Sequence, residues 1–171
     1  MEHSTTKGIV LVEKFYEDLE LWYPYLRLKE TGADMKIAGL ERDVTYNSKH
    51  GYPAESEIGV NDVNPANLDI LIIPGGYAPD HMRRHQAMVD IVRKAFDNSA
   101  VIGFICHGGW IAASAGIVNG KRCTSFFAIK DDMVNAGADW CDEEVVQDGN
   151  IISSRTPKDL PAFCSTIMQS V

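Results

Sequence analysis

The sequence lacks any long hydrophobic run, and this absence excludes a membrane-spanning helix. Such a helix needs roughly 20 consecutive apolar residues, and no stretch of this chain comes near that length. The first residues, Met1 to Lys7, also carry no apolar run of the kind found in signal peptides. We therefore expect a soluble protein of the cytoplasm.

Positive charge is scarce. The 171 residues include 16 Lys and Arg against 24 Asp and Glu, which gives a formal net charge of −8. No basic stripe of the kind that nucleic-acid-binding surfaces use is present. We therefore expect neither nucleic acid nor a membrane surface among the partners of this protein.

No Cys-x-x-Cys pair is present, which excludes a zinc ribbon and a thioredoxin-type redox motif. In a reducing compartment we expect four free thiols, at Cys106, Cys123, Cys141 and Cys164. His81 and His85 have the i, i+4 spacing of some metal ligands, but the Glu of a zincin is missing and arginines lie between them. The sequence therefore predicts no metal and no other cofactor.

Repeats, low-complexity tracts and linkers are absent as well, so we expect a single domain over residues 1–171. The chain is 45% hydrophobic and 23% charged, which is typical of a globular protein. Four apolar segments are predicted strands and two amphipathic segments are predicted helices: strands 8–12, 35–40, 69–74 and 100–105, and helices 17–31 and 86–98. Their alternation with short links predicts a layered α/β fold around a parallel sheet.

The remaining elements are less regular. Pro24 lies inside the first predicted helix and is expected to kink or interrupt it near Tyr23. Residues 41–63 are broken by Gly and Pro and suggest edge strands or a hairpin. We expect a short helix over 127–136, a hairpin with strands around 145–146 and 151–152, and a closing helix over 158–169.

The stretch from Ala100 to Ser114 has the pattern of a nucleophile elbow. An apolar strand leads to Cys106 at a turn, and small, helix-compatible residues follow at once. Amide groups at the start of that helix are expected to favour the thiolate of Cys106, so this should be the one thiol of low pKa. The alternative is a buried core cysteine, which is common in proteins.

Two glycines follow the predicted strand 69–74 and suggest an oxyanion hole. Gly75 and Gly76 let the backbone come close to a ligand, so the N–H of Gly76 could act together with the N–H of His107. His107 is also a candidate general base or partner of the thiolate. Glycines end strands for conformational reasons as well, which is the alternative interpretation.

Two carboxyl groups are candidates to complete the site. Glu17 follows the first strand, at the edge of the sheet where Cys106 should emerge, and when protonated it could donate a hydrogen bond to the sulfur. We therefore expect Glu17 to be needed for chemistry, although it could equally stabilise the start of a helix. Asp80, after the Gly-Gly turn, is the candidate to orient His107.

Several short sequence segments, which follow one another in the same order as in the family, resemble the PfpI family of the ThiJ/PfpI superfamily. The resemblance extends over nearly the whole chain. The segments are Tyr16–Leu21 with Tyr23-Pro24 and Arg27–Glu30; Lys49–Tyr52; Pro74–Gly76 with Ala78–Asp80; Ile105–Gly108; Ile129–Met133 with Asn135–Gly137; and Ser153–Pro157 with Asp159-Leu160. This resemblance implies a flavodoxin-like three-layer sandwich, related to class I glutamine amidotransferases, that assembles as homodimers or dimer-based hexamers.

The resemblance also implies roles for single residues. Cys106 is the implied nucleophile, Glu17 the carboxyl bonded to its sulfur and His107 its partner, while Asp80 matches an acidic residue that completes the triad from a neighbouring subunit. The chain departs from the family at Gly109 and Trp110, where Pro and Gln are usual. It also departs at Phe126, where Tyr is frequent. We expect Trp110 to crowd or reshape the rim of the substrate pocket and Phe126 to lack a hydroxyl donor there, and both are candidate substrate-binding residues.

The leading hypothesis is a cofactor-independent glyoxalase or deglycase that acts on methylglyoxal, glyoxal or their early adducts. Cys106 would attack a carbonyl, with Glu17 and His107 moving protons. A second hypothesis is an intracellular cysteine peptidase or amidase, the activity from which the family takes its name. A third is a redox-sensing stress protein or chaperone, in which Cys106 is oxidised rather than catalytic.

Overall fold

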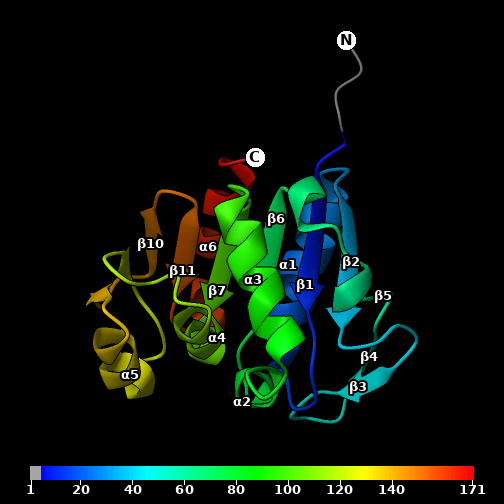
Figure 1. Ribbon diagram of the computed structural model, residues 1–171, viewed down its shortest axis with the longest axis horizontal. Helices are drawn as coiled ribbons and strands as arrows, with labels where there is room; N and C mark the ends of the chain where they lie inside the picture. Colours follow the sequence, from blue (N-terminus) through cyan, green and yellow to red (C-terminus); the bar gives the residue numbers. More distant parts are fainter. Residues whose placement is uncertain (1–4) are drawn as a thin grey trace.

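The computed structural model describes residues 5–171, so the prediction about the first residues lies partly outside this range. Its core is a seven-stranded sheet in the order β10-β11-β7-β6-β1-β2-β5 (Figure 1). The strands are β1 (Lys7–Leu11), β2 (Asp34–Gly39), β5 (Ile58–Gly59), β6 (Ile70–Ile73), β7 (Val101–Ile105), β10 (Val145–Asp148) and β11 (Ile151–Ser154). All neighbours pair in parallel except the edge hairpin of β10 and β11.

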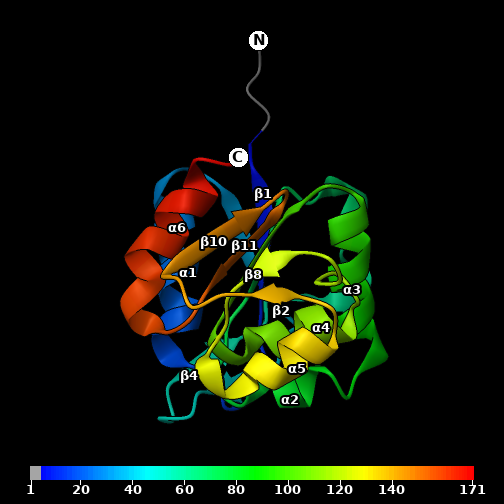
Figure 2. The same cartoon turned by 90° about the vertical axis from the view of Figure 1, so that its left-hand side faces the viewer.

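Helices cover both faces of this sheet. Figure 2 shows α1 (Asp18–Glu30) and α6 (Leu160–Met168) on one side, and α3 (Gln86–Asp97) on the other. The shorter α2 (Ala78–Met82), α4 (Gly109–Ser114) and α5 (Lys130–Asn135) gather below the sheet in Figure 1, beyond the carboxyl ends of β6 and β7. The predicted three-layer α/β sandwich with a mainly parallel sheet is therefore confirmed.

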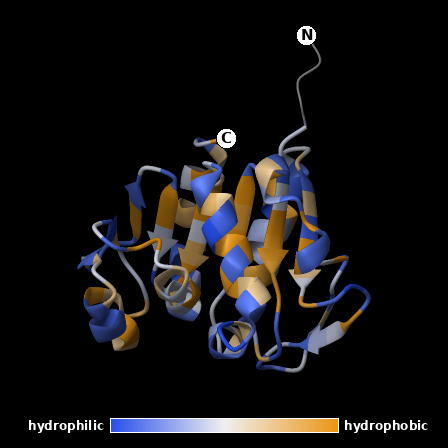
Figure 3. Ribbon diagram, in the orientation of Figure 1, coloured by the Kyte–Doolittle hydropathy of each residue, from blue (hydrophilic) through white to orange (hydrophobic). Residues whose placement is uncertain are grey.

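Burial explains why these segments form the centre of the fold. Every residue of Ile70–Ile73 and Val101–Ile105 is buried, as expected for strands covered on both faces. Figure 3 shows the central strands mostly in the orange of hydrophobic residues. Helix α3 alternates buried apolar positions with exposed polar ones, so one face packs against the sheet. The two central strands, β6 and β7, end where the Gly75-Gly76 turn and Cys106 begin.

The sequence predicts that Pro24 kinks or interrupts the first helix, and the interruption is wrong. Helix α1 runs unbroken from Asp18 to Glu30 with the proline inside it. Proline lacks the N–H that would bond to the carbonyl of Glu20, so one helical hydrogen bond is missing. Pro24, Tyr25 and Leu28 are all buried against the core, and this packing offsets the loss.

The smaller elements agree with the sequence except where they are very short. Residues 41–63 hold the predicted hairpin, formed by β3 (Thr45–Asn47) and β4 (Pro53–Glu55), and the edge strand β5. A parallel pair, β8 (Arg122–Cys123) with β9 (Asp139–Trp140), was not predicted because two residues show no periodicity. Short 3-10 turns complete the chain at Val60–Asp62, Pro65–Asn67, Cys106–Gly108, Phe127–Ile129 and Pro157–Asp159.

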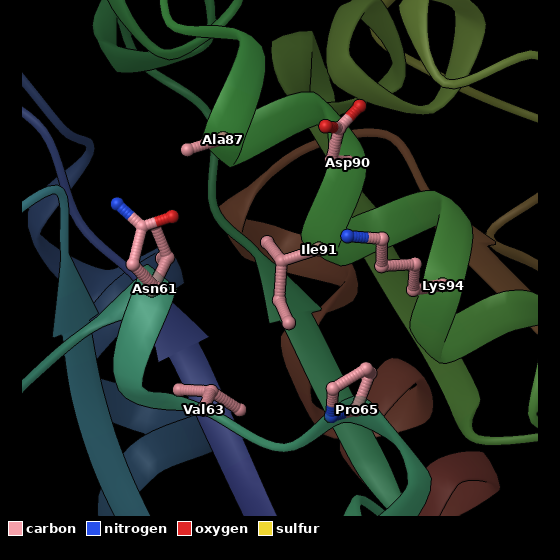
Figure 4. A pocket seen from close by; sticks show the side chains of 8 residues that line it. Asn61, Val63, Pro65, Ala87, Asp90, Ile91 and Lys94 are labelled. Atoms are coloured by element: carbon pink, nitrogen blue, oxygen red, sulfur yellow. The ribbon is translucent and has the colours of Figure 1, made fainter.

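A cavity of about 210 Å³ lies between α3 and the loop that leads into β6 (Figure 4). Asn61 faces it from the loop, while Asp90 and Lys94 come from the helix. It shares no lining residue with the pocket around Cys106. Within residues 5–171, no helix combines the length and the apolar character that a membrane span requires.

Candidate active site

Cys106 occupies a strained turn between β7 and α4, as the elbow pattern predicts. Its φ is 60°, a left-handed conformation that costs a non-glycine residue about 1–2 kcal/mol. The carbonyl of Cys106 accepts a hydrogen bond from the N–H of Phe126 at 3.2 Å, which helps to hold the turn. The Cys106 side chain is 9% exposed and lines a pocket of about 320 Å³.

Two backbone N–H groups point at the sulfur of Cys106, and they belong to Gly76 and His107. Gly76 has a φ of 77° and pairs with Tyr16 in an isolated antiparallel bridge. A Cβ atom at Gly76 would lie 2.5 Å from the carbonyl oxygen of Phe15, so only glycine fits this position. The two amides predicted to form an oxyanion hole are therefore brought together beside the sulfur.

The carboxyl beside the sulfur comes from Glu20, which the sequence reasoning missed. Glu20 is fully buried, and its Oε2 accepts a hydrogen bond from the N–H of Gly75 at 2.7 Å. Its Oε1 is buried without a hydrogen-bond partner among the described residues, and the carboxyl lies close enough to the Cys106 thiol for its charge to shift the pKa of that thiol. Gly75 thus serves the site by fixing this carboxyl.

Glu17 has a different position from the one predicted. It is the N-cap of α1, where its Oε2 accepts a hydrogen bond from the N–H of Glu20 at 2.8 Å. Glu17 lines the pocket, but the carboxyl that lies beside the Cys106 thiol is that of Glu20. These contacts agree with the alternative interpretation from the sequence, in which Glu17 stabilises the start of a helix.

The thiol and the carboxyl titrate as a coupled pair. Burial and the nearby charge of Glu17 raise the pKa of Glu20 to about 8. Burial and the charge of an ionised Glu20 raise the pKa of the Cys106 thiol to about 12, against the two N–H groups, which lower it. The net direction is opposite to the low pKa expected from the sequence, because burial of the thiol, together with the charge of ionised Glu20, outweighs the two amides.

His107 lies directly beside the sulfur. Its Nδ1 is 3.3 Å from Sγ of Cys106, so the predicted pairing of these adjacent side chains is present. Burial, followed by the positive charge of Lys49, lowers the pKa of His107. A neutral imidazole is the form that accepts a proton from a thiol. The rings of Trp110 and Phe126 both pack against it, each with its centroid 5.0 Å away.

Asp80 does not contact His107 within the subunit. It lies on α2, where its carboxylate forms an ion pair with Arg84. His81 and His85, two further histidines of this region, contact the ring of Phe15 and the carboxylate of Glu13 respectively. No group of three potential metal ligands is found within residues 5–171.

Lys49 is a second residue of the pocket that the sequence did not single out as functional. It lines the pocket beside Glu20, and its loop is tied to the first turn of α1. Asp18 accepts a 2.6 Å hydrogen bond from the Ser48 hydroxyl and pairs with the His50 ring at 2.7 Å. Three acidic residues of one turn therefore have separate contacts: Glu17 caps the helix, Asp18 holds the Lys49 loop, and Glu20 meets Cys106.

The other three cysteines are free thiols, as predicted, and lie outside the pocket. Cys123 and Cys164 are buried, and this burial raises the pKa of each to about 12. Cys141 is half-buried, and its thiol approaches the carbonyl of Cys123 at 3.7 Å. Cys106 is the one cysteine that lines the pocket with His107 and a buried carboxyl.

Comparison with known sequences gives matches over nearly the whole chain. Residues 6–170 match the DJ-1/PfpI family. A deglycase from Pyrococcus horikoshii is 46% identical, and the deglycase PfpI from Pyrococcus furiosus is 47% identical; each match covers 92% of this chain and 94% of the relative. A Bacillus subtilis relative whose name proposes a cysteine protease is 34% identical over 92% of this chain and 93% of its own.

Solved structures show the same fold. A two-domain protein from Anabaena variabilis, with DJ-1/ThiJ/PfpI-like and ferritin-like domains, superposes with a TM-score of 0.94 at 35% identity. The match covers 96% of this chain and 48% of that protein. DJ-1beta from Drosophila melanogaster gives a TM-score of 0.89 at 24% identity, over 97% of this chain and 90% of that one, a likeness of fold alone.

Proposed function

The chain belongs to the DJ-1/PfpI family, and from this premise we propose that it is a cysteine-dependent deglycase. Its proposed substrates are the early adducts of methylglyoxal and glyoxal, together with the free dicarbonyls. The observation that carries the proposal is the surroundings of Cys106: a strained elbow, two N–H groups at the sulfur and the buried carboxyl of Glu20. Relatives named deglycases at 46–47% identity support it.

The proposed reaction begins when the Cys106 thiol loses its proton to His107 or Glu20 and the sulfur attacks the aldehyde carbon of methylglyoxal. The carbonyl oxygen takes up a proton, which gives a hemithioacetal. In an adduct, the amine leaves from this same carbon and takes a proton with it. The N–H groups of Gly76 and His107 lie where they can stabilise the negative charge that develops on oxygen.

The hemithioacetal then rearranges within the site. Glu20 or His107 removes the hydrogen from the carbon bonded to sulfur, and a proton returns to the neighbouring carbon, which yields a thioester of lactate. Water hydrolyses the thioester, releasing lactate and restoring the thiol. Methylglyoxal and water thus become lactate without an external oxidant or reductant, so the residues of this chain suffice for the proposed steps.

A peptidase or amidase is the second candidate. The same nucleophile and N–H groups could attack a peptide carbonyl. The name of the Bacillus subtilis relative favours this activity, while the small volume of the pocket, about 320 Å³, favours a small carbonyl substrate. A non-catalytic redox sensor would use the same cysteine without turning over either kind of substrate.

We also propose that the protein assembles as a homodimer or a dimer-based hexamer in which Asp80 orients His107 of a neighbouring subunit. Asp80 does not contact its own His107 but lines a surface pocket together with Phe15 and Tyr77. These two aromatic side chains are 46% and 67% exposed, which is unusual for large apolar groups and favours a covered surface.

Purified protein tests the proposed function directly. Native protein and a Cys106→Ala variant are mixed with methylglyoxal, with a methylglyoxal-treated amino acid and, separately, with a fluorogenic peptide. We expect lactate to form, as detected by NMR, only with native protein. Peptide cleavage without lactate would replace the deglycase proposal by the peptidase. Turnover of neither substrate, or equal turnover by Cys106→Ala, would overturn catalysis by this thiol.

A further inference from the structure

The His107 ring is oriented by aromatic packing rather than by a polar partner of its own subunit. Its Nδ1 faces the sulfur of Cys106, and no hydrogen bond to its Nε2 is found within residues 5–171. Trp110 meets the ring edge to face, at an interplanar angle of 69°. Phe126 packs on it at 31°, so two rings define the plane of the imidazole.

Trp110 is itself anchored from two further elements. Its Nε1–H donates a hydrogen bond to Oδ2 of Asp132, on α5, at 2.8 Å. The guanidinium of Arg83 lies over the Trp110 ring at 5.6 Å, and Arg83 also donates from Nε to the Ser114 hydroxyl at 3.1 Å. A tryptophan held at its polar end and covered on its ring has little freedom to rotate.

The contact between Trp110 and α5 depends on close packing of α5 against the start of α4. A Cβ atom at Gly109 would lie 2.8 Å from the sulfur of the buried Met133. Glycine at this position therefore lets α4 approach α5, and Asp132 precedes Met133 on α5. The two unusual residues of the elbow, Gly109 and Trp110, thus belong to one arrangement.

We propose that Trp110, anchored by Asp132, is a positioning residue that holds the His107 imidazole with Nδ1 toward the sulfur of Cys106. Neither Trp110 nor Asp132 touches the sulfur, so both act through His107. The inference rests on the proposed function only in assigning the proton transfer to His107. The orientation itself is a property of the free protein and is measurable without substrate.

Loss of the anchor has a specific consequence for proton transfer. A tryptophan freed from Asp132 adopts other rotamers and no longer covers one side of the imidazole. The ring then rotates away from sulfur and becomes better hydrated, which reverses the desolvation that disfavours its cation. A misplacement of about 1 Å in a reacting group can lower turnover by about 100-fold.

The charged groups around His107 influence the pKa that a titration of its imidazole measures. Lys49 acts on the ring from the loop before β4, and Glu20 acts through Cys106 from α1. Arg83, at the end of α2, lies over the Trp110 ring, and Asp132, on α5, accepts the hydrogen bond from Nε1 of Trp110. Removing Asp132 takes a negative charge away, which alone would lower the pKa of His107, whereas loss of burial would raise it.

The test compares Asp132→Ala and Trp110→Phe with Asp131→Ala, a neighbouring exposed residue of the same helix outside this contact. We expect the first two variants to lower kcat about 10-fold with KM unchanged, and to raise the pKa of His107 as followed by imidazole NMR. The double variant should equal the single variants, because both break one interaction. Asp132→Asn, which keeps an acceptor, should restore most of the native signal.

An unchanged His107 tautomer in Asp132→Ala, together with an unchanged His107 NMR pKa in Trp110→Phe, which alters no charge, would overturn the proposal, as would equal effects of Asp131→Ala and Asp132→Ala. Additive losses in the double variant would also contradict it. A failed deglycase assay gives a different pattern. In that case the NMR signals of His107 still respond to Trp110→Phe, while no variant, native protein included, converts the dicarbonyl.

Discussion

Glu17 and Glu20 are joined by a hydrogen bond in which the N–H of Glu20 donates to Oε2 of Glu17 at 2.8 Å. The residue predicted to bond to the sulfur is thus the cap that starts the helix, and the carboxyl beside the Cys106 thiol belongs to the residue three positions later. Both side chains line the same pocket, and it is the charge of Glu20 that raises the pKa of the nucleophile.

The first prediction separates these two glutamates. Glu20→Gln keeps the size of the side chain but removes a transferable proton, so we expect turnover to fall by about 100-fold or more. Glu17→Gln should keep turnover within a few-fold of native and lower stability by about 1 kcal/mol through a weaker cap. Steady-state kinetics and thermal unfolding measure the two effects. The reverse order would return the catalytic role to Glu17.

The second prediction concerns stability against pH. The pKa of Glu20 is raised from 4.5 to about 8 in the folded protein, so between these values the folded state binds more protons than the unfolded state. Stability should therefore fall as pH rises from about 4.5 to about 8 because of this group. Denaturant unfolding should show this slope in native protein and lose it in Glu20→Gln. Parallel curves would contradict the raised pKa.

The third prediction uses the reactivity of the thiol. Burial and the charge of ionised Glu20 raise the pKa of the Cys106 thiol to about 12, so the charge that Glu20 gains as pH rises through about 8 opposes formation of the thiolate. Alkylation of Cys106, followed by mass spectrometry, should therefore begin at lower pH in Glu20→Gln than in native protein. Cys123 and Cys164 should remain unlabelled in the folded protein because both are buried. Equal labelling of these thiols would refute a selective reactivity of Cys106.

The fourth prediction concerns assembly. If Asp80 serves His107 of a neighbour, then inactive Cys106→Ala and Asp80→Ala proteins should regain part of the activity when dissociated and reassembled together. Mixed oligomers would contain one subunit with an intact Cys106 and His107 next to another that supplies Asp80. Native mass spectrometry confirms the exchange. Absence of recovery despite exchange would place Asp80 outside the site or within its own chain.

The elbow could be predicted because its signal is local. An apolar strand, one cysteine and small residues follow each other directly, and the turn that they specify gives Cys106 its left-handed conformation. Gly75 and Gly76 were found for a similar reason, since they end the other central strand, β6. Residues that are adjacent in sequence to the ends of β6 and β7 are therefore adjacent in the site.

The distance of Glu20 from β1 along the sequence could not identify it as a site residue. The direction of its side chain depends on where α1 begins. With Glu17 as the cap, positions 20, 24 and 28 share one buried face of the helix. The signal that could have identified Glu20 is its position as a charged residue on the same helix face as Pro24 and Leu28. The contact between Trp110 and Asp132 joins residues 22 positions apart through the packing of α4 on α5, which no sequence pattern encodes.

The first turn of α1 also limits how the chain length can change at this point. Each residue of an α-helix turns the next by about 100°, so one inserted residue between Tyr16 and Glu20 would rotate the cap, the Asp18 contact and the Glu20 carboxyl relative to one another. Substitutions at these three positions change them one at a time, but an insertion or deletion would displace all three together. The segment from Tyr16 to Leu21 is therefore a fixed-length part of the protein.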